Sequence, residues 1–190
     1  MNFLFNNKKN DKISDDKINE FNIHNTDKFS LNVLFNEDLV DARVVDIYDG
    51  DTITCVLSIN KKYYNFKVRL AGIDTCELKS KNEDNKLLAV NAKKRLCQLI
   101  IPDFDFNDKN NKELNKGLDK ILNEKCYIIK IRLGEFDLYG RILGWLYNKD
   151  SKINPPIEES FNHILIKENL AYKYEGKTKL SEDEQIQLLK

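Results

Sequence analysis

The chain has 190 residues, 41% hydrophobic and 33% charged, which is enough for one domain with a real core plus extensions. No apolar run approaches the roughly twenty residues of a membrane helix, and the N-terminus is apolar too briefly for a secretory signal peptide, so we expect an intracellular protein. The formal net charge of zero argues mildly against a dedicated nucleic-acid binder, which is commonly basic, and says little against an enzyme.

Cysteine and histidine usage narrows the chemistry further. The four cysteines form no Cys-x-x-Cys pair, and the chain has only two histidines, so a zinc cluster is not expected. We expect reduced and mostly buried thiols that pack as small hydrophobic groups.

The first part of the chain, residues 1–40, is rich in Asn, Lys and Asp and has few periodic apolar positions. This composition indicates an N-terminal extension that is partly disordered. We expect the folded domain to cover residues 41–180, with a short C-terminal helix over 181–190.

Three strands are predicted in succession at the start of the domain. They cover residues 42–47, 52–59 and 63–73. An Asp-Gly turn joins the first two, which is a strong hairpin signal. In the third, apolar Phe66 and Val68 alternate with Lys67 and Arg69, as expected for a strand with one buried face.

The second half of the domain mixes helices with two further strands. Apolar residues at helical spacing predict an amphipathic helix over residues 83–100, which Pro102 ends. Residues 103–123 are rich in Asp, Asn and Lys and are interpreted as an inserted loop with room for one helical turn. The remaining predicted elements are strands at 126–133 and 141–147, a helix at 158–169, and a terminal helix begun by the capping box of Ser181.

Five strands with a helix between the third and the fourth match the partly open barrel of the OB-fold. The predicted fold class is therefore α+β, mainly β, with a five-stranded OB-fold barrel and about three packed helices.

Three polar segments stand out against this framework. The first is the turn Asp49-Gly50-Asp51-Thr52; the second is residues 68–77, with Arg69, Asp74, Thr75 and Glu77; the third is residues 137–141, which end in Arg141. Each segment alone is an ordinary turn, or a strand that ends in a polar loop.

Taken together, the three segments supply what phosphodiester cleavage needs. Asp51 and Asp74, with a backbone carbonyl, offer hard oxygen ligands to a divalent cation. Glu77 is left free to act on water as a general base, worth typically ~10² to 10⁴-fold in rate. Arg69 and Arg141 can each bind phosphate oxygens through two N–H groups. No histidine or cysteine nucleophile is required.

These segments, in this order, resemble the staphylococcal-nuclease (thermonuclease-like) family over about residues 40–179. The resemblance implies calcium held by Asp51, Asp74 and the Thr75 carbonyl, with Glu77 acting on the attacking water. It also implies that Arg69 and Arg141 bind the scissile phosphate.

The same resemblance implies further roles and a product. Asp49 would support the metal-binding turn, and Tyr139 would lie near the nucleotide phosphate. The implied activity is calcium-dependent hydrolysis of DNA and RNA with little sequence specificity, leaving 3′-phosphate ends. We expect a monomer with no membrane association.

The sequence departs from the family at three positions. Cys76 stands where the family usually has proline, which predicts a less rigid loop. Leu138 occupies a position that is basic in some members. Asn169 replaces a frequent glycine at a helix end, which Asn tolerates because it accepts the left-handed conformation.

A mixed aromatic and basic segment follows near the C-terminus. Tyr172, Tyr174 and Lys177 are interpreted as a substrate-binding platform, in which rings stack on bases and cations hold phosphates. A surface strand with solvated charges explains the same residues equally well.

Two other classes of function compete with the nuclease. One is a non-catalytic OB-fold module that binds nucleic acid or protein, which need not retain all five of Asp51, Arg69, Asp74, Glu77 and Arg141. The other is a structural or virion-associated interaction protein, which would depend on the N-terminal extension, where there is no motif.

Overall fold

The computed structural model describes residues 39–106 and 110–190, so the N-terminal extension lies almost wholly outside the described residues. Within these residues there are seven strands: β1 (Leu39–Ile47), β2 (Thr52–Ile59), β3 (Lys62–Leu70), β4 (Ile73–Asp74), β5 (Tyr127–Phe136), β6 (Ile142–Tyr147) and β7 (Tyr172–Lys173). The helices in the same described ranges are α2 (Glu83–Ile100), α3 (Asn111–Glu124), α4 (Phe161–Lys167) and α5 (Glu182–Leu189), together with the 3₁₀ turn η2 (Ile157–Glu159).

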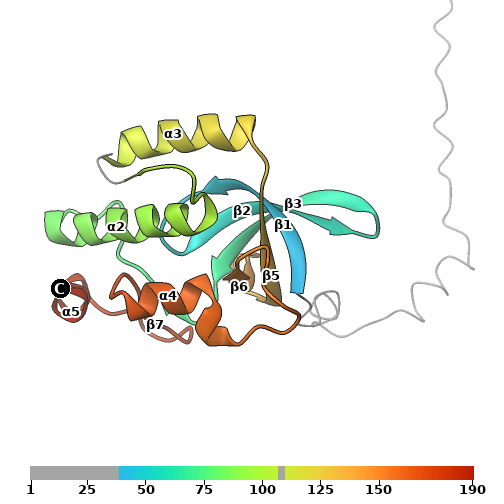
Figure 1. Ribbon diagram of the computed structural model, residues 1–190. Helices are drawn as coiled ribbons and strands as arrows, with labels where there is room; N and C mark the ends of the chain where they lie inside the picture. The colour runs from blue at the N-terminus through green and yellow to red at the C-terminus, as the bar shows by residue number, and fades with distance from the viewer. Residues whose placement is uncertain (1–38, 107–109) are drawn as a thin grey trace, which may run out of the picture.

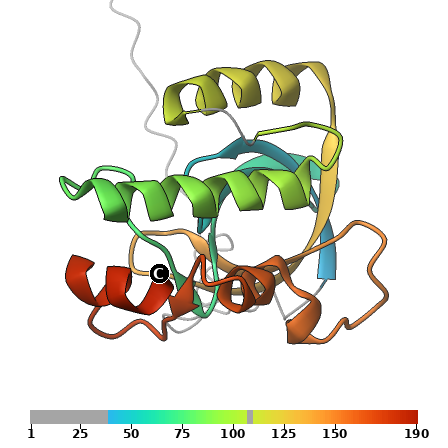
Figure 2. The same cartoon turned by 60° about the vertical axis from the view of Figure 1, so that its left-hand side comes forward.

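Five of the strands form a closed barrel in the order β1-β2-β3-β6-β5, and β1 pairs with β5 to complete the ring. All neighbours are antiparallel except β3 and β6, whose parallel pairing spans only Val68–Leu70 on β3. The helices pack around the barrel (Figures 1 and 2), and the β2–β3 hairpin extends away from them (Figure 1). The predicted five-stranded OB-fold barrel is confirmed, in a closed form.

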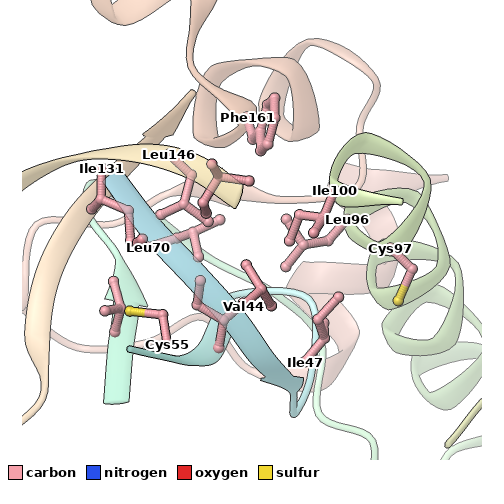
Figure 3. Close-up of a cluster of buried hydrophobic side chains, with 14 of the residues drawn as sticks. Val44, Ile47, Cys55, Leu70, Leu96, Cys97, Ile100, Ile131, Leu146 and Phe161 are labelled. Carbon is pink, nitrogen blue, oxygen red and sulfur yellow. The ribbon is translucent and has the colours of Figure 1, made fainter. Parts of the chain in front are cut away.

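Alternation along the strands builds the core. Inward-facing Val44, Leu70 and Leu146 are almost completely buried, and α2 and α4 add Leu96 and Phe161 from outside the sheet (Figure 3). Burying side chains of this kind contributes roughly 1.5 to 3 kcal/mol each, which explains why the alternating pattern determines the register.

A buried asparagine joins α4 to the barrel. The Asn162 carbonyl oxygen accepts the Leu146 N–H at 3.1 Å, and its amide donates to the carbonyls of Ala71 and Gly144 at 2.9 and 3.0 Å. The side chain thus satisfies backbone groups where β3 and β6 meet, which holds the strand ends that carry the site.

Helix α3 corrects the interpretation of residues 103–123 as a loop. Asn110 and Glu113 form a capping box, and the helix buries Leu114, Leu118 and Leu122 against the barrel. These leucines recur every four residues, so they share one face. The surrounding Asn, Asp and Lys residues give the segment a loop-like composition and conceal that periodicity. The described residues therefore contain four α-helices.

The described residues agree with the expected cysteine chemistry. All four cysteines are free; Cys55, Cys76 and Cys97 are buried, whereas Cys126 is exposed. No helix in the described part of the chain is long and apolar enough to cross a membrane.

Candidate active site

A surface cavity of about 750 Å³ opens where the ends of β3 and β6 meet the C-terminal segment. The predicted site residues that line it are Asp49, Asp51, Arg69, Thr75, Glu77, Tyr139, Arg141 and Tyr174. The fold thus brings residues from all three polar segments to one place.

The β1–β2 turn carries two of the acids and is held against α2. The Asp49 carboxylate accepts the Asp51 N–H at 3.1 Å, and the Asp51 carboxylate accepts the Thr52 hydroxyl at 2.9 Å. A Cβ on Gly50 would lie 2.7 Å from the Cβ of Ala92, closer than real contacts allow. Only glycine therefore lets the turn pack this closely on the helix.

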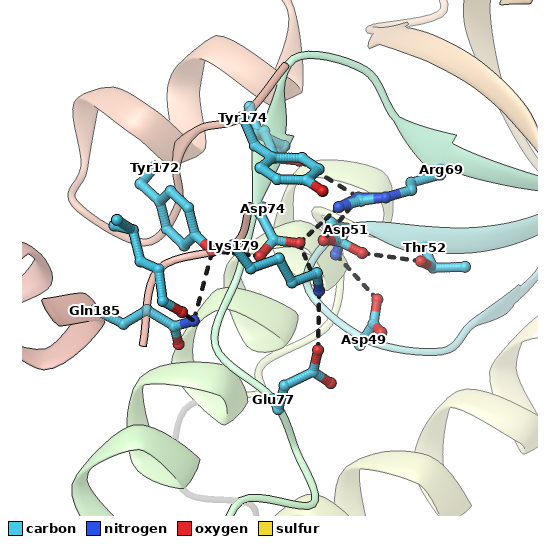
Figure 4. A network of polar contacts seen from close by, with 12 residues as sticks. Asp49, Asp51, Thr52, Arg69, Asp74, Glu77, Tyr172, Tyr174, Lys179 and Gln185 are labelled. Carbon is cyan, nitrogen blue, oxygen red and sulfur yellow. Dashed lines mark hydrogen bonds and ion pairs between the residues drawn. The ribbon is translucent and has the colours of Figure 1, made fainter. Parts of the chain in front are cut away.

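Arg69 joins two buried carboxylates from different segments. One terminal nitrogen donates to Asp51 Oδ2 at 3.1 Å, and the other donates to Asp74 Oδ1 at 2.6 Å (Figure 4). All three side chains are less than a tenth exposed. The planar guanidinium can make both bonds at once, which a lysine ammonium cannot do with the same geometry.

Burial disfavours the ionised form of two acids near Arg69. Burial, followed by the charge of Asp49, raises the pKa of Asp51 to about 7, although Arg69 opposes the shift. Burial also raises the pKa of Asp49. Burial alone would lower the pKa of Arg69, but Asp51 and Asp74 reverse the effect and raise it. Additional positive charge would therefore stabilise the ionised cluster.

Asp74 is held from its other side by the C-terminal segment. It pairs with Tyr172 in the β4–β7 ladder, and the Tyr172 hydroxyl donates to Asp74 Oδ2. Gln185 on α5 donates to the same hydroxyl at 3.5 Å and accepts from Asn85 on α2 at 2.9 Å. Asn85 in turn accepts the Glu77 N–H at 3.3 Å. Two helices therefore fix the loop of residues 74–77.

Glu77 is an exposed acid at the cavity, with 61% of its side chain accessible. Its carboxylate accepts from the Lys179 ammonium at 3.0 Å, and the same ammonium lies 3.0 Å from Asp74 Oδ1. Lys179 lines the cavity but was not among the site residues predicted from the sequence. Its position depends on the fold of the C-terminal segment, so no local motif distinguishes it from the other lysines nearby.

Arg141 enters the cavity from the β5–β6 turn. Its Nε donates to Asp137 Oδ2 at 2.7 Å, and its guanidinium lies 5.5 Å from the centre of the Tyr139 ring. Tyr139 itself is 85% exposed. Asp137 Oδ1 also accepts hydrogen bonds from the backbone N–H groups of Tyr139 and Arg141, both at 2.9 Å. The turn therefore orients the Arg141 side chain, which stays partly exposed to solvent.

The predicted platform of Tyr172, Tyr174 and Lys177 separates in the structure. Tyr172 is buried beneath Asp74, whereas the Tyr174 ring covers Arg69, with 5.5 Å between the ring centre and the guanidinium. The Tyr174 hydroxyl donates to the Lys177 carbonyl at 2.7 Å. Lys177 does not line the cavity, and Lys179 does.

The structure shows where the three residues that depart from the family pattern lie. Cys76 is buried with Ala89 and Leu189 in a small second core. This packing fixes the loop at the position where the family usually has proline. Leu138 is fully exposed at the cavity rim, and Asn169 has a φ of +55°, the left-handed conformation expected for it.

A closed five-stranded barrel with acids and arginines gathered at one cavity defines an OB-fold domain with a site rich in both kinds of charge. The chain matches the family described as staphylococcal nuclease homologue over residues 67–190 and therefore belongs to it. The match includes Arg69, Asp74, Glu77 and Arg141 but not the turn with Asp51. A comparison with curated proteins gave no match.

Proposed function

We propose that this protein is a calcium-dependent nuclease that hydrolyses phosphodiester bonds in DNA and RNA with little sequence specificity and leaves 3′-phosphate ends. The observation that carries the proposal is the position of Arg69. It lies between buried Asp51 and Asp74, in a cavity that also presents Glu77 and Arg141.

The donor set suits calcium. Among residues 39–106 and 110–190, no three His, Cys, Asp or Glu side chains form a ready-made metal cluster. Calcium, however, accepts backbone carbonyls and water beside carboxylates, so Asp51, Asp74 and the Thr75 carbonyl would hold it together with several water molecules. Burial, followed by the charge of Asp49, raises the pKa of Asp51, and a bound cation would stabilise the ionised carboxylate. When bound, calcium would supply positive charge to the phosphate.

The remaining residues have distinct roles in the proposed reaction. Arg69 and Arg141 bind the phosphate oxygens and stabilise the charge that grows on them. Glu77 takes a proton from the attacking water as the new bond to phosphorus forms and the bond to the 5′-oxygen breaks, and the released 5′-oxygen takes a proton from solvent water to become a hydroxyl. Asp49 and Asp137 orient Asp51 and Arg141 through the hydrogen bonds described above.

Broad substrate use follows from the kind of contact. Acids, arginines and a metal interact with phosphate, which is the same in every nucleotide, so they carry no base information. Tyr139 and Tyr174 present aromatic rings at the cavity, and stacking tolerates every base.

The decisive test is digestion of end-labelled single-stranded DNA and RNA with calcium, and again with excess chelator. We expect cleavage only with calcium and products with 3′-phosphate ends. Binding without cleavage across calcium concentrations would instead assign the chain to the non-catalytic OB-fold modules.

A further inference from the structure

The outer half of β3 extends beyond the barrel. β2 pairs with β3 along its whole length, from Thr52 opposite Arg69 to Ile59 opposite Lys62. Among the described strands, β6 adds a partner only to Val68–Leu70. Residues 62–67 of β3 and residues 54–59 of β2 therefore form a two-stranded hairpin that projects away from the helices (Figure 1).

Strand alternation places one row of side chains on the outer face of β3. Val68 and Leu70 point into the core, so Arg69 and Lys67 point outward, and residues 65 and 63 continue the row to the hairpin tip. Val68 is opposite Ile142 in the parallel β3–β6 ladder, and extending this register by one residue brings Lys67 alongside Arg141, which immediately precedes β6. The row thus begins at the two proposed phosphate-binding arginines.

The hairpin is locally cationic and aromatic in a chain of zero net charge. Residues 58–67 contain Lys61, Lys62 and Lys67 and no acid, and none of these lysines forms an ion pair among the described residues. Tyr63 is 77% exposed. Lys67 is opposite Thr54 on β2, and Thr54 is in turn opposite Asp46 on β1, so this acid lies two strands away from Lys67.

We propose that this outer row, defined as Lys67, Asn65 and Tyr63, binds the single-stranded nucleic acid that leads away from the phosphate held by Arg69 and Arg141. The inference rests on the proposed function, which places a phosphate at those arginines. Lys67 holds the next backbone phosphate, and the Tyr63 ring stacks on a base further along. At about 3.3 Å per residue, Arg69 and Tyr63 are separated by roughly 20 Å of strand, enough for a few nucleotides.

The sequence of side chains along the row favours single-stranded nucleic acid as the ligand over a duplex or a protein. A cation beside the arginines and an exposed ring at the far end match a chain of phosphates with free bases. Bases stacked inside a duplex offer no face to Tyr63. The projecting hairpin also has a second, inner-facing row with Lys62 and Tyr64, which provides a matched control.

The test compares two double variants, Lys67→Gln with Tyr63→Ser and Lys62→Gln with Tyr64→Ser. Binding of a fluorescein-labelled 12-nucleotide single strand is measured by anisotropy, in chelator and, with phosphorothioate linkages, in calcium. We expect the outer-row variant to bind roughly 5- to 150-fold more weakly, because it loses one stacked base. The slope of log affinity against log salt should fall by about 0.7 for the lost phosphate contact. The control variant should stay within about twofold of the parent.

The outcomes separate this inference from the proposed function. Equal binding by the two double variants overturns the inference, even if the parent cleaves DNA with calcium. Selective loss in the outer-row variant supports it, even if the parent cleaves nothing. A parent that binds no single strand in either condition overturns both.

Discussion

Tyr172 and Asp74 are joined twice, once as partners in the β4–β7 ladder and once by the hydrogen bond from the tyrosine hydroxyl to the carboxylate. Tyr172 precedes the C-terminal helix α5, whereas Asp74 follows the barrel strand β3. The C-terminal segment is therefore part of the site, because it fixes an acid that we propose as a calcium ligand.

The first prediction concerns this hydrogen bond. Tyr172→Phe keeps the buried ring but removes a donor from a fully buried carboxylate, so the free energy of unfolding should fall by about 1 to 3 kcal/mol. Urea unfolding followed by fluorescence measures it. Tyr174→Phe is the control, because it loses only a bond to the exposed Lys177 carbonyl and should cost less than about 0.5 kcal/mol. Equal losses in the two variants would show that the Tyr172 hydroxyl has no special role.

The second prediction is that substituting Arg69 and Arg141 affects the stability of the protein differently but its activity similarly. Arg69→Lys breaks a buried double contact, so we expect a loss of about 1 to 3 kcal/mol in the free energy of unfolding. Arg141 is partly exposed and pairs with one carboxylate, so Arg141→Lys should change stability by less than about 0.5 kcal/mol.

Both variants should cleave DNA roughly 10²- to 10³-fold more slowly, which is the typical effect of losing one hydrogen-bond donor to the transition state. The measurements are urea unfolding and the initial rate of cleavage at saturating calcium. An Arg141→Lys variant that kept the full rate would contradict its role at the phosphate.

Apolar periodicity and capping residues in the sequence predict several strands and helices correctly. The strand at 52–59 and the helix at 83–100 have the same limits in the structure as in the prediction, and the Ser181 capping box begins α5 as expected. Helix α3 was missed because polar residues outnumber the leucines that repeat along its buried face.

The parts of the site that sequence could not provide depend on contacts across the chain. Lys179 reaches Glu77 from 102 residues away, and Gln185 reaches Asn85 from 100. Neither contact can be recognised from a regular spacing in the sequence, because the two residues are brought together only when the whole domain folds. The acids and arginines were easier to find because each lies in a short segment with its own turn or strand pattern.

The third prediction tests α3 as part of the core. Leu114 is fully buried, so Leu114→Ala should lower the free energy of unfolding by about 2 to 5 kcal/mol, through lost contacts and the cavity left behind. Leu188→Ala on α5 removes the same atoms from a side chain that is 56% exposed and should cost little. Similar small losses in both would favour the loop over the helix for residues 111–124.

The fourth prediction follows from the raised pKa of Asp51. Its pKa is about 7 in the folded protein against 3.8 for the ordinary group, so folding favours the protonated form. The stability that this carboxyl contributes is complete below about pH 4 and is lost as the pH rises through about 7. Asp51→Asn mimics the protonated form at every pH.

In chelator, the variant and the parent should therefore differ little near pH 4. Above pH 7 the variant should be more stable, by on the order of 2 to 4 kcal/mol. Thermal unfolding across this pH range measures the difference. With saturating calcium the parent should become more stable than the Asp51→Asn variant, because calcium stabilises only a protein that binds it and the variant lacks a proposed ligand. A constant difference at all pH values would exclude a perturbed Asp51.

The last prediction isolates the proposed base. Glu77→Gln keeps the size of the side chain and the Asn85 bond to the backbone N–H, but it cannot accept a proton from water. Turnover should fall by about 10² to 10⁴-fold, while affinity for a single-stranded oligonucleotide stays within a few-fold. Single-turnover cleavage and anisotropy measure the two quantities separately. Glu83→Gln changes an exposed carboxylate on α2 that pairs only with Lys86, so it should leave both unchanged. A Glu77→Gln variant that cleaved at the parent rate would mean that another group activates the water.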